Sequence, residues 1–267
     1  MNKPRVIVLS GYGLNCEEEA RFGFELAGAV SEIVHINDII SKQKKLSSYQ
    51  ILVVPGGFSF GDDLGSGLAF ASRMRNHLWE EILSFVRRDK LVLGICNGFQ
   101  ILANLGLLPA LDGRFGKREI ALLLNKNARY TVRWVDLKVT NDSLWLRGIT
   151  TLSLPIAHGE GKFFASREVL KKLEKKKRIA LRYFRGTICT AIDLSDNPNG
   201  SVENIAAVTD PTGKIFGLMP HPDRALYSFQ HPLWHRQKEE LLRRKVKLPK
   251  FGDGYFIFQN AVKYFSS

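Results

Sequence analysis

A cysteine between two glycines is the part of this chain best suited to chemistry. The segment Leu91–Leu102 reads LVLGICNGFQIL, with Cys96 at the centre of the GICNG pentapeptide. An apolar run before it and a helical apolar pattern after it are typical of a nucleophile elbow, a sharp turn from strand to helix. Glycine suits this turn, because a side chain at Gly98 would crowd the neighbouring backbone. The helix N-terminus favours a thiolate, so Cys96 is a candidate nucleophile, with a merely buried cysteine as the alternative.

A thiol nucleophile needs a base, and Met219–Arg224 (MPHPDR) offers one directly after an expected strand. His221 and Asp223 are two residues apart, so in an extended segment they share a face, and the flanking prolines favour an extended chain. A carboxylate beside an imidazole orients it and stabilises its cation. The segment predicts that His221 and Asp223 complete a triad with Cys96, while a structural histidine at a strand end is the alternative.

Acyl chemistry also needs donors for a developing oxyanion. Pro55–Phe58 (PGGF) follows an expected strand, and its glycines let a backbone N–H approach a ligand closely. We predict that a backbone N–H of the Gly56–Gly57 turn and the N–H of Asn97, next to the nucleophile, form the oxyanion hole. An ordinary turn is the alternative for the two glycines.

The segment Ile156–Gly161 (IAHGEG) places a histidine and a glutamate between glycines. His158 and Glu160 are candidates for substrate contacts or for an alternative base pair. We expect no metal here, because no third ligand lies nearby in the sequence. The three cysteines of the chain are far apart, which argues against a zinc or redox pair and against a disulfide framework.

The elements expected around these motifs alternate between strand and helix over the first ~105 residues. This alternation predicts an α/β fold with a doubly wound, mostly parallel sheet and helices on both faces. The functional site of such a sheet lies outside the carboxyl ends of its strands, where Gly57 and Cys96 would both fall. Strands are expected at Val6–Ser10, Glu32–Ile36, Ile51–Val54 and Leu91–Ile95, and helices at Cys16–Ala29, with Asn15 as N-cap, and at Leu68–Arg88.

The second half of the chain is less regular. Neither a repeat nor a low-complexity linker divides it, so we expect a single domain over residues 1–267. A polar, basic stretch at about 224–254 reads as an insertion. Further strands are expected at Arg129–Thr140, Thr151–Ile156, Ile205–Thr209 and Lys214–Leu218, and a closing helix at Tyr255–Phe265.

Composition limits the classes of function. Hydrophobic residues make up 45% and charged residues 24%, as in ordinary globular proteins. No apolar run approaches the roughly 18 residues of a membrane span, and the first apolar run is too short for a secretory signal, so a cytoplasmic protein without membrane contact is expected. The net charge of +13 resides partly in basic runs at 171–178 and 243–247 that contain no aromatic residue. We therefore expect solvated surface and not a nucleic-acid site.

Taken together, the segments GICNGFQIL, VVPGGFSFGDD, LPIAHGEGKF and GLMPHPDR resemble the class I, triad-type glutamine amidotransferases. The combination of IAHGEG with MPHP is similar to the amidotransferase subunits of phosphoribosylformylglycinamidine synthase, an enzyme of purine biosynthesis. The resemblance runs from Val6 to the closing IFQNAVKYF, nearly the whole chain.

The resemblance implies that Cys96 attacks the side-chain amide of glutamine and forms a thioester, with His221 as acid and base. It implies further that Gly57 and Asn97 hold the oxyanion. Gln100, one helical turn after Cys96, becomes a candidate contact for glutamine, together with His158 and Glu160 of IAHGEG.

The resemblance also implies partners. Ammonia would pass to a separate synthetase subunit that converts formylglycinamide ribonucleotide to formylglycinamidine ribonucleotide, and a small third subunit is conceivable. ATP and Mg are expected on that synthetase, with no cofactor in this chain.

The chain departs from the family pattern at one position of the expected triad. The family usually reads HPE where this chain reads HPD, so Asp223 has one methylene less with which to reach His221. This departure leaves a non-catalytic scaffolding subunit of the same fold open as an alternative. A glutaminase coupled to another ammonia acceptor is a further alternative, although the IAHGEG motif argues against it.

Overall fold

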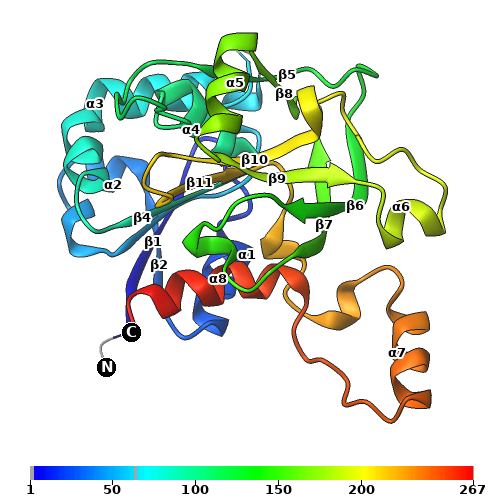
Figure 1. Cartoon of the computed structure of the whole chain (residues 1–267). Coiled ribbons are helices and arrows are strands. Elements are labelled where there is room, and N and C mark those ends of the chain that lie inside the picture. Colours follow the sequence, from blue (N-terminus) through cyan, green and yellow to red (C-terminus); the bar gives the residue numbers. More distant parts are fainter. Residues whose placement is uncertain (1–2, 63–64, 267) are drawn as a thin grey trace.

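The structure, a computed structural model, describes residues 3–62 and 65–266 of the chain. Across these residues, one sheet of nine strands has the order β2-β1-β3-β4-β11-β10-β9-β6-β7, and β5 pairs with β8 in a separate ribbon (Figure 1). The strands are β1 (Arg5–Ser10), β2 (Val30–His35), β3 (Ile51–Val54), β4 (Leu91–Ile95), β5 (Ile120–Leu123), β6 (Thr131–Val139), β7 (Thr151–His158), β8 (Lys162–Ala165), β9 (Ile179–Phe184), β10 (Ile205–Thr209) and β11 (Ile215–Leu218).

Strand direction confirms the predicted α/β fold with a mostly parallel sheet. Strands β2, β1, β3, β4 and β11 pair in parallel. The pairs from β11 onward, through β10, β9, β6 and β7, are antiparallel. In the described sheet, only β10 and β6 therefore run against the other strands.

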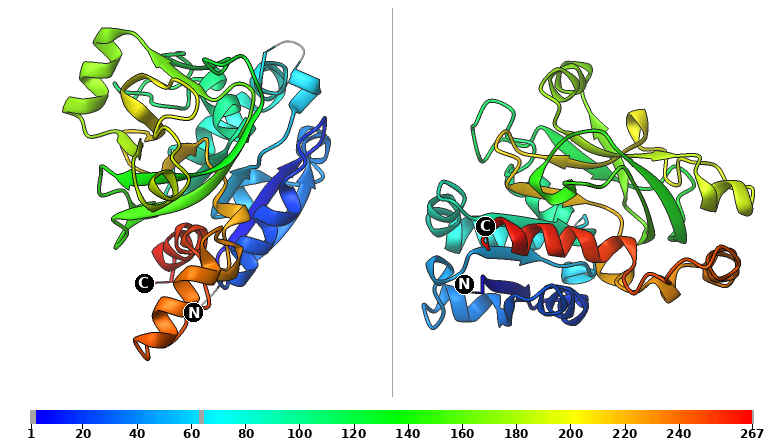
Figure 2. Two further views of the ribbon diagram at one scale, coloured as in Figure 1. Left: turned by 90° about the vertical axis from the view of Figure 1, so that its right-hand side faces the viewer. Right: turned by 60° about the horizontal axis from the view of Figure 1, so that its bottom comes forward.

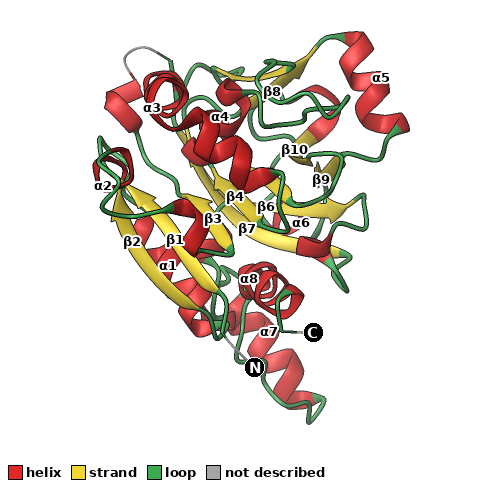
Figure 3. Ribbon diagram, turned by 90° about the vertical axis from the view of Figure 1, so that its left-hand side faces the viewer, coloured by secondary structure: helices red, strands yellow, loops and turns green. Residues whose placement is uncertain are grey.

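Helices cover both faces of the sheet, as predicted (Figure 3). Helices α1 and α8 pack against each other, and α3 packs against α4, which lies over β3, β4 and β11. The central strands β3, β4 and β11 are buried at every position, as expected for strands covered on both faces. The helices are α1 (Glu17–Leu26), α2 (Ile36–Ile40), α3 (Leu68–Val86), α4 (Asn97–Leu105), α5 (Arg167–Lys175), α6 (Thr187–Ala191), α7 (Trp234–Arg243) and α8 (Asp253–Tyr264).

The predicted start of the first helix was wrong. The N-cap of α1 is Cys16, whose side chain makes no capping hydrogen bond, and Asn15 lies one residue before it. The Asn15 side chain instead accepts a hydrogen bond from the thiol of Cys16 at 3.3 Å. The helix does begin with three glutamates, which suit the positive end of the helix dipole.

The second half of the chain contains strands and a helix that were not predicted from the sequence. Strands β5, β8 and β9 and helix α5 were not predicted. Between His221 and α8, the stretch read as an insertion forms short 3-10 turns and α7, which projects from the body of the molecule in Figures 1 and 2. No residue of α7 is buried. None of the helices in the described ranges is long and apolar enough to cross a membrane.

Candidate active site

The turn from β4 into α4 has the geometry of a nucleophile elbow. Cys96 adopts φ 50° and ψ −107°, a conformation that costs free energy in a non-glycine residue and is concentrated at functional sites. A methyl group at Gly98 would put its carbon 1.8 Å from the carbonyl oxygen of Val54, so only glycine lets α4 approach β3 this closely. Cys96 is 5% exposed at the carboxyl end of its strand, where the sequence placed it.

Strand β11 brings His221 to the same edge. It pairs in parallel with β4, with Leu218 opposite Ile95, and His221 follows three residues after Leu218. The backbone N–H of His221 then donates to the carbonyl oxygen of Pro155 in β7 at 2.8 Å. Two strands that are remote in sequence therefore fix the backbone that carries the imidazole.

Asp223 reaches His221 directly, although not in the way the sequence predicted. One carboxylate oxygen lies 3.2 Å and the other 3.4 Å from Nδ1 of His221. The segment from Pro222 to Arg224 is a 3-10 turn and not an extended chain, so the expected extended geometry was wrong. The turn itself brings the shorter aspartate side chain back to the imidazole, and no bridging water is needed to span the gap.

The electrostatics of His221 are dominated by its burial and by two anionic neighbours. Its side chain is almost completely inaccessible, and burial alone would disfavour the imidazolium. Negative charge on Asp223 and on Cys96 outweighs that burial and raises the pKa of His221 to about 10. Its Nε2 atom is buried and has no hydrogen-bond partner among the described residues, so it is free for a reacting group.

The N–H groups of Asn97 and Gly57 are the predicted oxyanion donors, and this role stays a prediction. Asn97 is the first residue of α4, so its N–H has no acceptor within the helix. Gly57 and Leu14 face each other in an isolated antiparallel bridge. The hydrogen bonds of this bridge are made by the residues on either side of them, and the N–H of Gly57 takes no part in these bonds. A methyl group at Gly57 would lie 2.5 Å from the carbonyl oxygen of Gly13, which explains the glycine.

Gln100 and Glu160, both predicted to contact substrate, are joined in this structure. The Gln100 amide donates to the backbone oxygen of Glu160 at 2.6 Å and accepts from the Asn97 side chain at 2.8 Å. The Glu160 carboxylate accepts from the backbone N–H of Ser66 at 3.2 Å. These contacts tie the elbow to the β7–β8 turn, and the substrate contacts themselves stay predictions.

His158 is a neutral imidazole whose Nε2 atom can accept a hydrogen bond. It ends the inward-facing residues of β7, and its Nδ1 lies 3.1 Å from the Asn125 side-chain oxygen. That oxygen also accepts from the N–H of Gly161, so the Nδ1 of His158 carries the hydrogen and its Nε2 carries a lone pair. Burial, and then the charge of His221, lower the pKa of His158 to about 4. The suggested base pair of His158 with Glu160 does not form, because each side chain has another partner.

Sequence reasoning missed a second cysteine beside the base. Cys16 accepts a hydrogen bond from the Arg224 guanidinium at 3.0 Å, and donor atoms of Cys16, His221 and Asp223 lie within 4.8 Å of one another. Burial, and then the charge of Asp223, raise the pKa of Cys16 to about 12, so it stays a thiol. The guanidinium places a positive charge next to the Cys16 sulfur. The spacing of 208 residues between Cys16 and Arg224 hides this contact from the sequence.

An aromatic pair borders the site. The rings of Phe58, next to Gly57, and of Tyr130 have centroids 5.8 Å apart. Tyr130 is half exposed, and burial together with the charge of Cys96 raises its pKa, which places its hydroxyl in the field of the nucleophile. The sequence marked Tyr130 only as part of an expected strand region.

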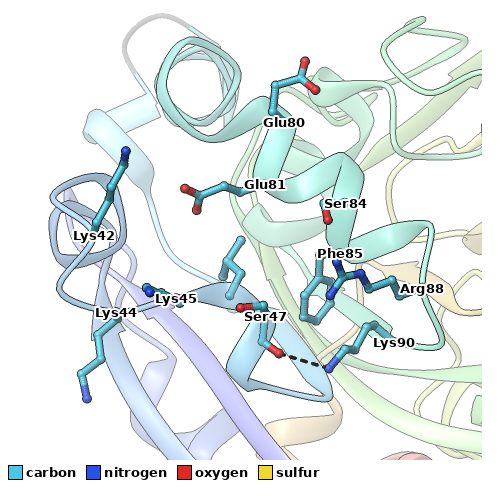
Figure 4. A pocket seen from close by; sticks show the side chains of 11 residues that line it. Lys42, Lys44, Lys45, Ser47, Glu80, Glu81, Ser84, Phe85, Arg88 and Lys90 are labelled. Atoms are coloured by element: carbon cyan, nitrogen blue, oxygen red, sulfur yellow. Dashed lines mark hydrogen bonds between the residues drawn. The ribbon is translucent and has the colours of Figure 1, made fainter.

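A separate hollow of about 450 Å³ lies at the opposite edge of the sheet (Figure 4). Its lining comes from the segments that precede β3 and β4, at the amino ends of these strands, whereas Cys96 lies at the carboxyl end. It is rich in lysine, and Lys90 donates there to the backbone oxygens of Ser47 and Tyr49. Because this hollow contains no nucleophile–base pair, we place the chemistry at Cys96.

Comparisons with known proteins agree with this geometry. A family model described as a CobB/CobQ-like glutamine amidotransferase domain matches residues 3–265. The chain is 46% identical to the phosphoribosylformylglycinamidine synthase subunit PurQ of Methanococcus maripaludis, over 98% of each chain. It is 40% identical to PurQ of Dehalococcoides mccartyi, over 99% of this chain and 98% of the relative.

A solved structure gives the same result. The structure of PurLQS from Thermotoga maritima contains a chain with 32% identity and a TM-score of 0.71, over 98% of this chain and 99% of that one. The matches extend over nearly the full length of this chain and of each relative. The chain therefore belongs to the glutamine amidotransferase family, among the PurQ subunits of phosphoribosylformylglycinamidine synthase.

Proposed function

We propose that this chain hydrolyses glutamine to glutamate and ammonia and supplies the ammonia to a synthetase subunit. That subunit converts formylglycinamide ribonucleotide to formylglycinamidine ribonucleotide in purine biosynthesis. The observation that carries the chemistry is the juxtaposition of Cys96 with the buried His221–Asp223 pair at the carboxyl edge of the sheet. The synthetase subunit is inferred as the partner from the family membership of the chain.

In the first half of the proposed reaction, the Cys96 thiolate attacks the side-chain carbonyl carbon of glutamine, forming a C–S bond. The oxyanion that develops accepts hydrogen bonds from the N–H groups of Gly57 and Asn97. His221, protonated on Nε2, gives that proton to the amide nitrogen as the C–N bond breaks, and ammonia leaves. A γ-glutamyl thioester then remains on Cys96.

In the second half, His221 takes a proton from water, and the hydroxide attacks the thioester carbon. The C–S bond breaks, glutamate leaves, and the thiolate–imidazolium pair is restored. Asp223 stabilises the imidazolium in both halves through the 3.2 Å contact with Nδ1. Each turnover consumes one water and one glutamine.

The partner assignment follows from the solved relative, whose name combines PurL, PurQ and a third component, S. We infer that this chain binds an equivalent synthetase subunit and a small third subunit. ATP and Mg belong to the synthetase in this proposal, and this chain brings no cofactor of its own. A cytoplasmic location fits its three unpaired cysteines, because thiols stay reduced in that compartment.

Replacing the nucleophile tests the proposal. In the complex with the synthetase subunit, its nucleotide substrate and ATP, Cys96→Ala should lower glutamine-dependent glutamate release by about a thousandfold or more. Ammonia-dependent synthesis should be kept, because that chemistry lies on the other chain. Cys189→Ser, which changes a buried cysteine outside the site, is the control.

Two outcomes would contradict the proposal. Glutamate release that survives in Cys96→Ala would exclude this nucleophile. A folded wild-type chain that releases no glutamate with or without its partner would instead indicate a scaffolding subunit.

A further inference from the structure

A hollow of about 440 Å³ lies between helix α7 and the body of the molecule. Its walls come from α7, from the turns before and after it, from the starts of α6 and α8, and from β6 and β7. Figure 1 shows α7 projecting away from the sheet. The volume falls within the roughly 300–1,000 Å³ of small-ligand sites. None of the lining residues is a candidate for the chemistry at Cys96, so this hollow needs an explanation of its own.

Aromatic rings reach this hollow from several elements. Trp134 stands on β6 and Trp234 in the first turn of α7, and neither side chain is fully buried. The aromatic side chains that line the hollow are Trp134, Tyr227, Trp234, Phe251 and Phe256. Accessible aromatic faces stack with planar heterocycles, and a nucleobase gains about tenfold in affinity from such a contact. The apolar part of the wall therefore suits a nucleobase.

A hydrogen-bond acceptor and a donor lie beside these rings. The backbone N–H of Ser153 donates to one oxygen of Asp253 at 2.6 Å, and that of Leu233 donates to Nδ1 of His231 at 3.1 Å. The hydrogen of the His231 ring is therefore on Nε2. In the described part of the chain, this N–H and the other Asp253 oxygen have no hydrogen-bond partner.

The acceptor and the donor belong to one corner of the hollow. Burial lowers the pKa of His231, and the charge of Asp253 opposes that shift, so the two groups are neighbours. The rings of His231 and Trp134 have centroids 5.4 Å apart. An acceptor and a donor at the edge of an aromatic face are complementary to the hydrogen-bonding edge of a nucleobase, which also pairs a donor with an acceptor.

Arg244 places a guanidinium at the other end of α7. Trp234, Gln237, Leu241 and Arg244 line the hollow at helical spacing, so they share one face of the helix. The ten residues of α7 span about 15 Å, which separates Trp234 from Arg244. Among the described residues Arg244 forms no ion pair, because Glu240 pairs with Arg236. A guanidinium without a fixed anion is suited to a phosphate, whose oxygens match its fork of donors.

We propose that this hollow binds a nucleoside monophosphate. The base stacks on Trp134 with its edge toward Asp253 and His231, and the phosphate pairs with Arg244. Thr187 and Gln237 also line the hollow and offer a hydroxyl and an amide to the sugar. This site lies outside the proposed glutaminase centre and does not depend on it.

Calorimetric titration of the full chain with AMP as the probe tests the site. We expect saturable binding that Arg244→Met weakens about tenfold or more, in the range for a lost hydrogen bond to a charged group. Trp234→Leu should weaken it about tenfold through lost stacking. Arg243→Met is the matched control, because it removes the neighbouring charge outside the hollow. An unchanged melting temperature shows that each variant is folded.

Three analogues identify the groups that are recognised. Adenosine lacks the phosphate, so it should bind wild type and Arg244→Met equally and more weakly than AMP binds wild type. Ribose 5-phosphate lacks the base, and purine riboside 5′-phosphate lacks the amine that would donate to Asp253, so both should bind more weakly than AMP.

Three results would overturn the inference. They are the absence of saturable AMP binding, equal affinity for AMP and ribose 5-phosphate, and an AMP affinity that Arg244→Met and Trp234→Leu leave unchanged. Because the readout is binding to the chain alone, none of these results depends on whether Cys96 hydrolyses glutamine.

Discussion

The backbone N–H of Cys96 donates a hydrogen bond to the carbonyl oxygen of Leu218 at 2.8 Å. This bond joins the residue that follows β4 to the last residue of β11, so the strand that presents the nucleophile and the strand that presents the base end at one level. His221 follows Leu218 by three residues and lies beside the thiol, whose charge contributes to the raised pKa of its imidazole. The distance between nucleophile and base is thereby set by sheet pairing and not by a loop.

Asp223 should matter less than His221. We expect Asp223→Asn to retain about a hundredfold more glutaminase activity than His221→Ala, because the carboxylate only orients and stabilises the imidazole. Glutamate release by the complex measures both. Asp193→Asn, at an exposed surface ion pair with Arg185, is the control. Equal losses in the two variants would show that the carboxylate is indispensable.

His158 should make the fold sensitive to mild acid. Its pKa is about 4 in the folded chain and about 6.5 in the unfolded chain, so the unfolded state binds the proton first as pH falls. Stability is therefore full above pH 6.5 and is lost toward pH 4. His158→Asn should reduce the loss between pH 7.5 and pH 5 by about 2 kcal/mol.

Urea unfolding at the two pH values measures that difference. The exposed His77→Asn of α3 should leave the pH dependence of wild type unchanged. His221, with a pKa raised to about 10 in the folded chain, adds stability as pH falls from 7.5 to 5, but it contributes to wild type and to His158→Asn alike and cancels in the difference between them. An unaltered acid response of His158→Asn would refute the prediction.

Gly98→Ala should destabilise the chain even though alanine favours helices. The added carbon would meet the Val54 carbonyl oxygen at 1.8 Å, and forcing α4 away from β3 should cost about 1–3 kcal/mol. Gly159→Ala is the matched control, because its nearest neighbour would be 3.8 Å away on Tyr130. Chemical denaturation of both variants should show a loss for Gly98 alone.

Alkylation should distinguish the three cysteines. Iodoacetamide at pH 7.5 should modify Cys96 and spare Cys16 and Cys189 in the folded chain, because reaction requires a thiolate. The pKa of Cys16 is raised to about 12 by burial and by Asp223, and burial likewise raises the pKa of Cys189. Peptide mass spectrometry measures the label, and Cys96→Ala should remain unlabelled. Modification of Cys16 at a rate similar to Cys96 would contradict the assignment.

Local patterns in the sequence were sufficient for the central architecture. The strands at Ile51–Val54, Leu91–Ile95 and Ile205–Thr209 were predicted with the bounds that the structure has. Their short apolar runs are bounded by turn residues, and burial on both faces removes any ambiguity about which side chains face the core. The nucleophile elbow could also be predicted, because its strand, its two glycines and its helix are consecutive in the chain.

Elements with weaker patterns escaped prediction. The ribbon of β5 and β8 has only four residues in each strand, and the sequences IALL and KFFA show no regular alternation of polar and apolar residues. The turn at Pro222–Arg224 was misread because prolines restrict φ without deciding between an extended chain and a 3-10 turn.

By itself, the sequence determined which residues could do chemistry and which strand ends would carry them, because those properties depend on residue type and on local periodicity. Tertiary structure alone decided what surrounds them. Cys16 meets Arg224 across 208 residues, and His158 meets Asn125 across 33. Such contacts arise when separate strands are placed side by side, and no spacing along the chain encodes them.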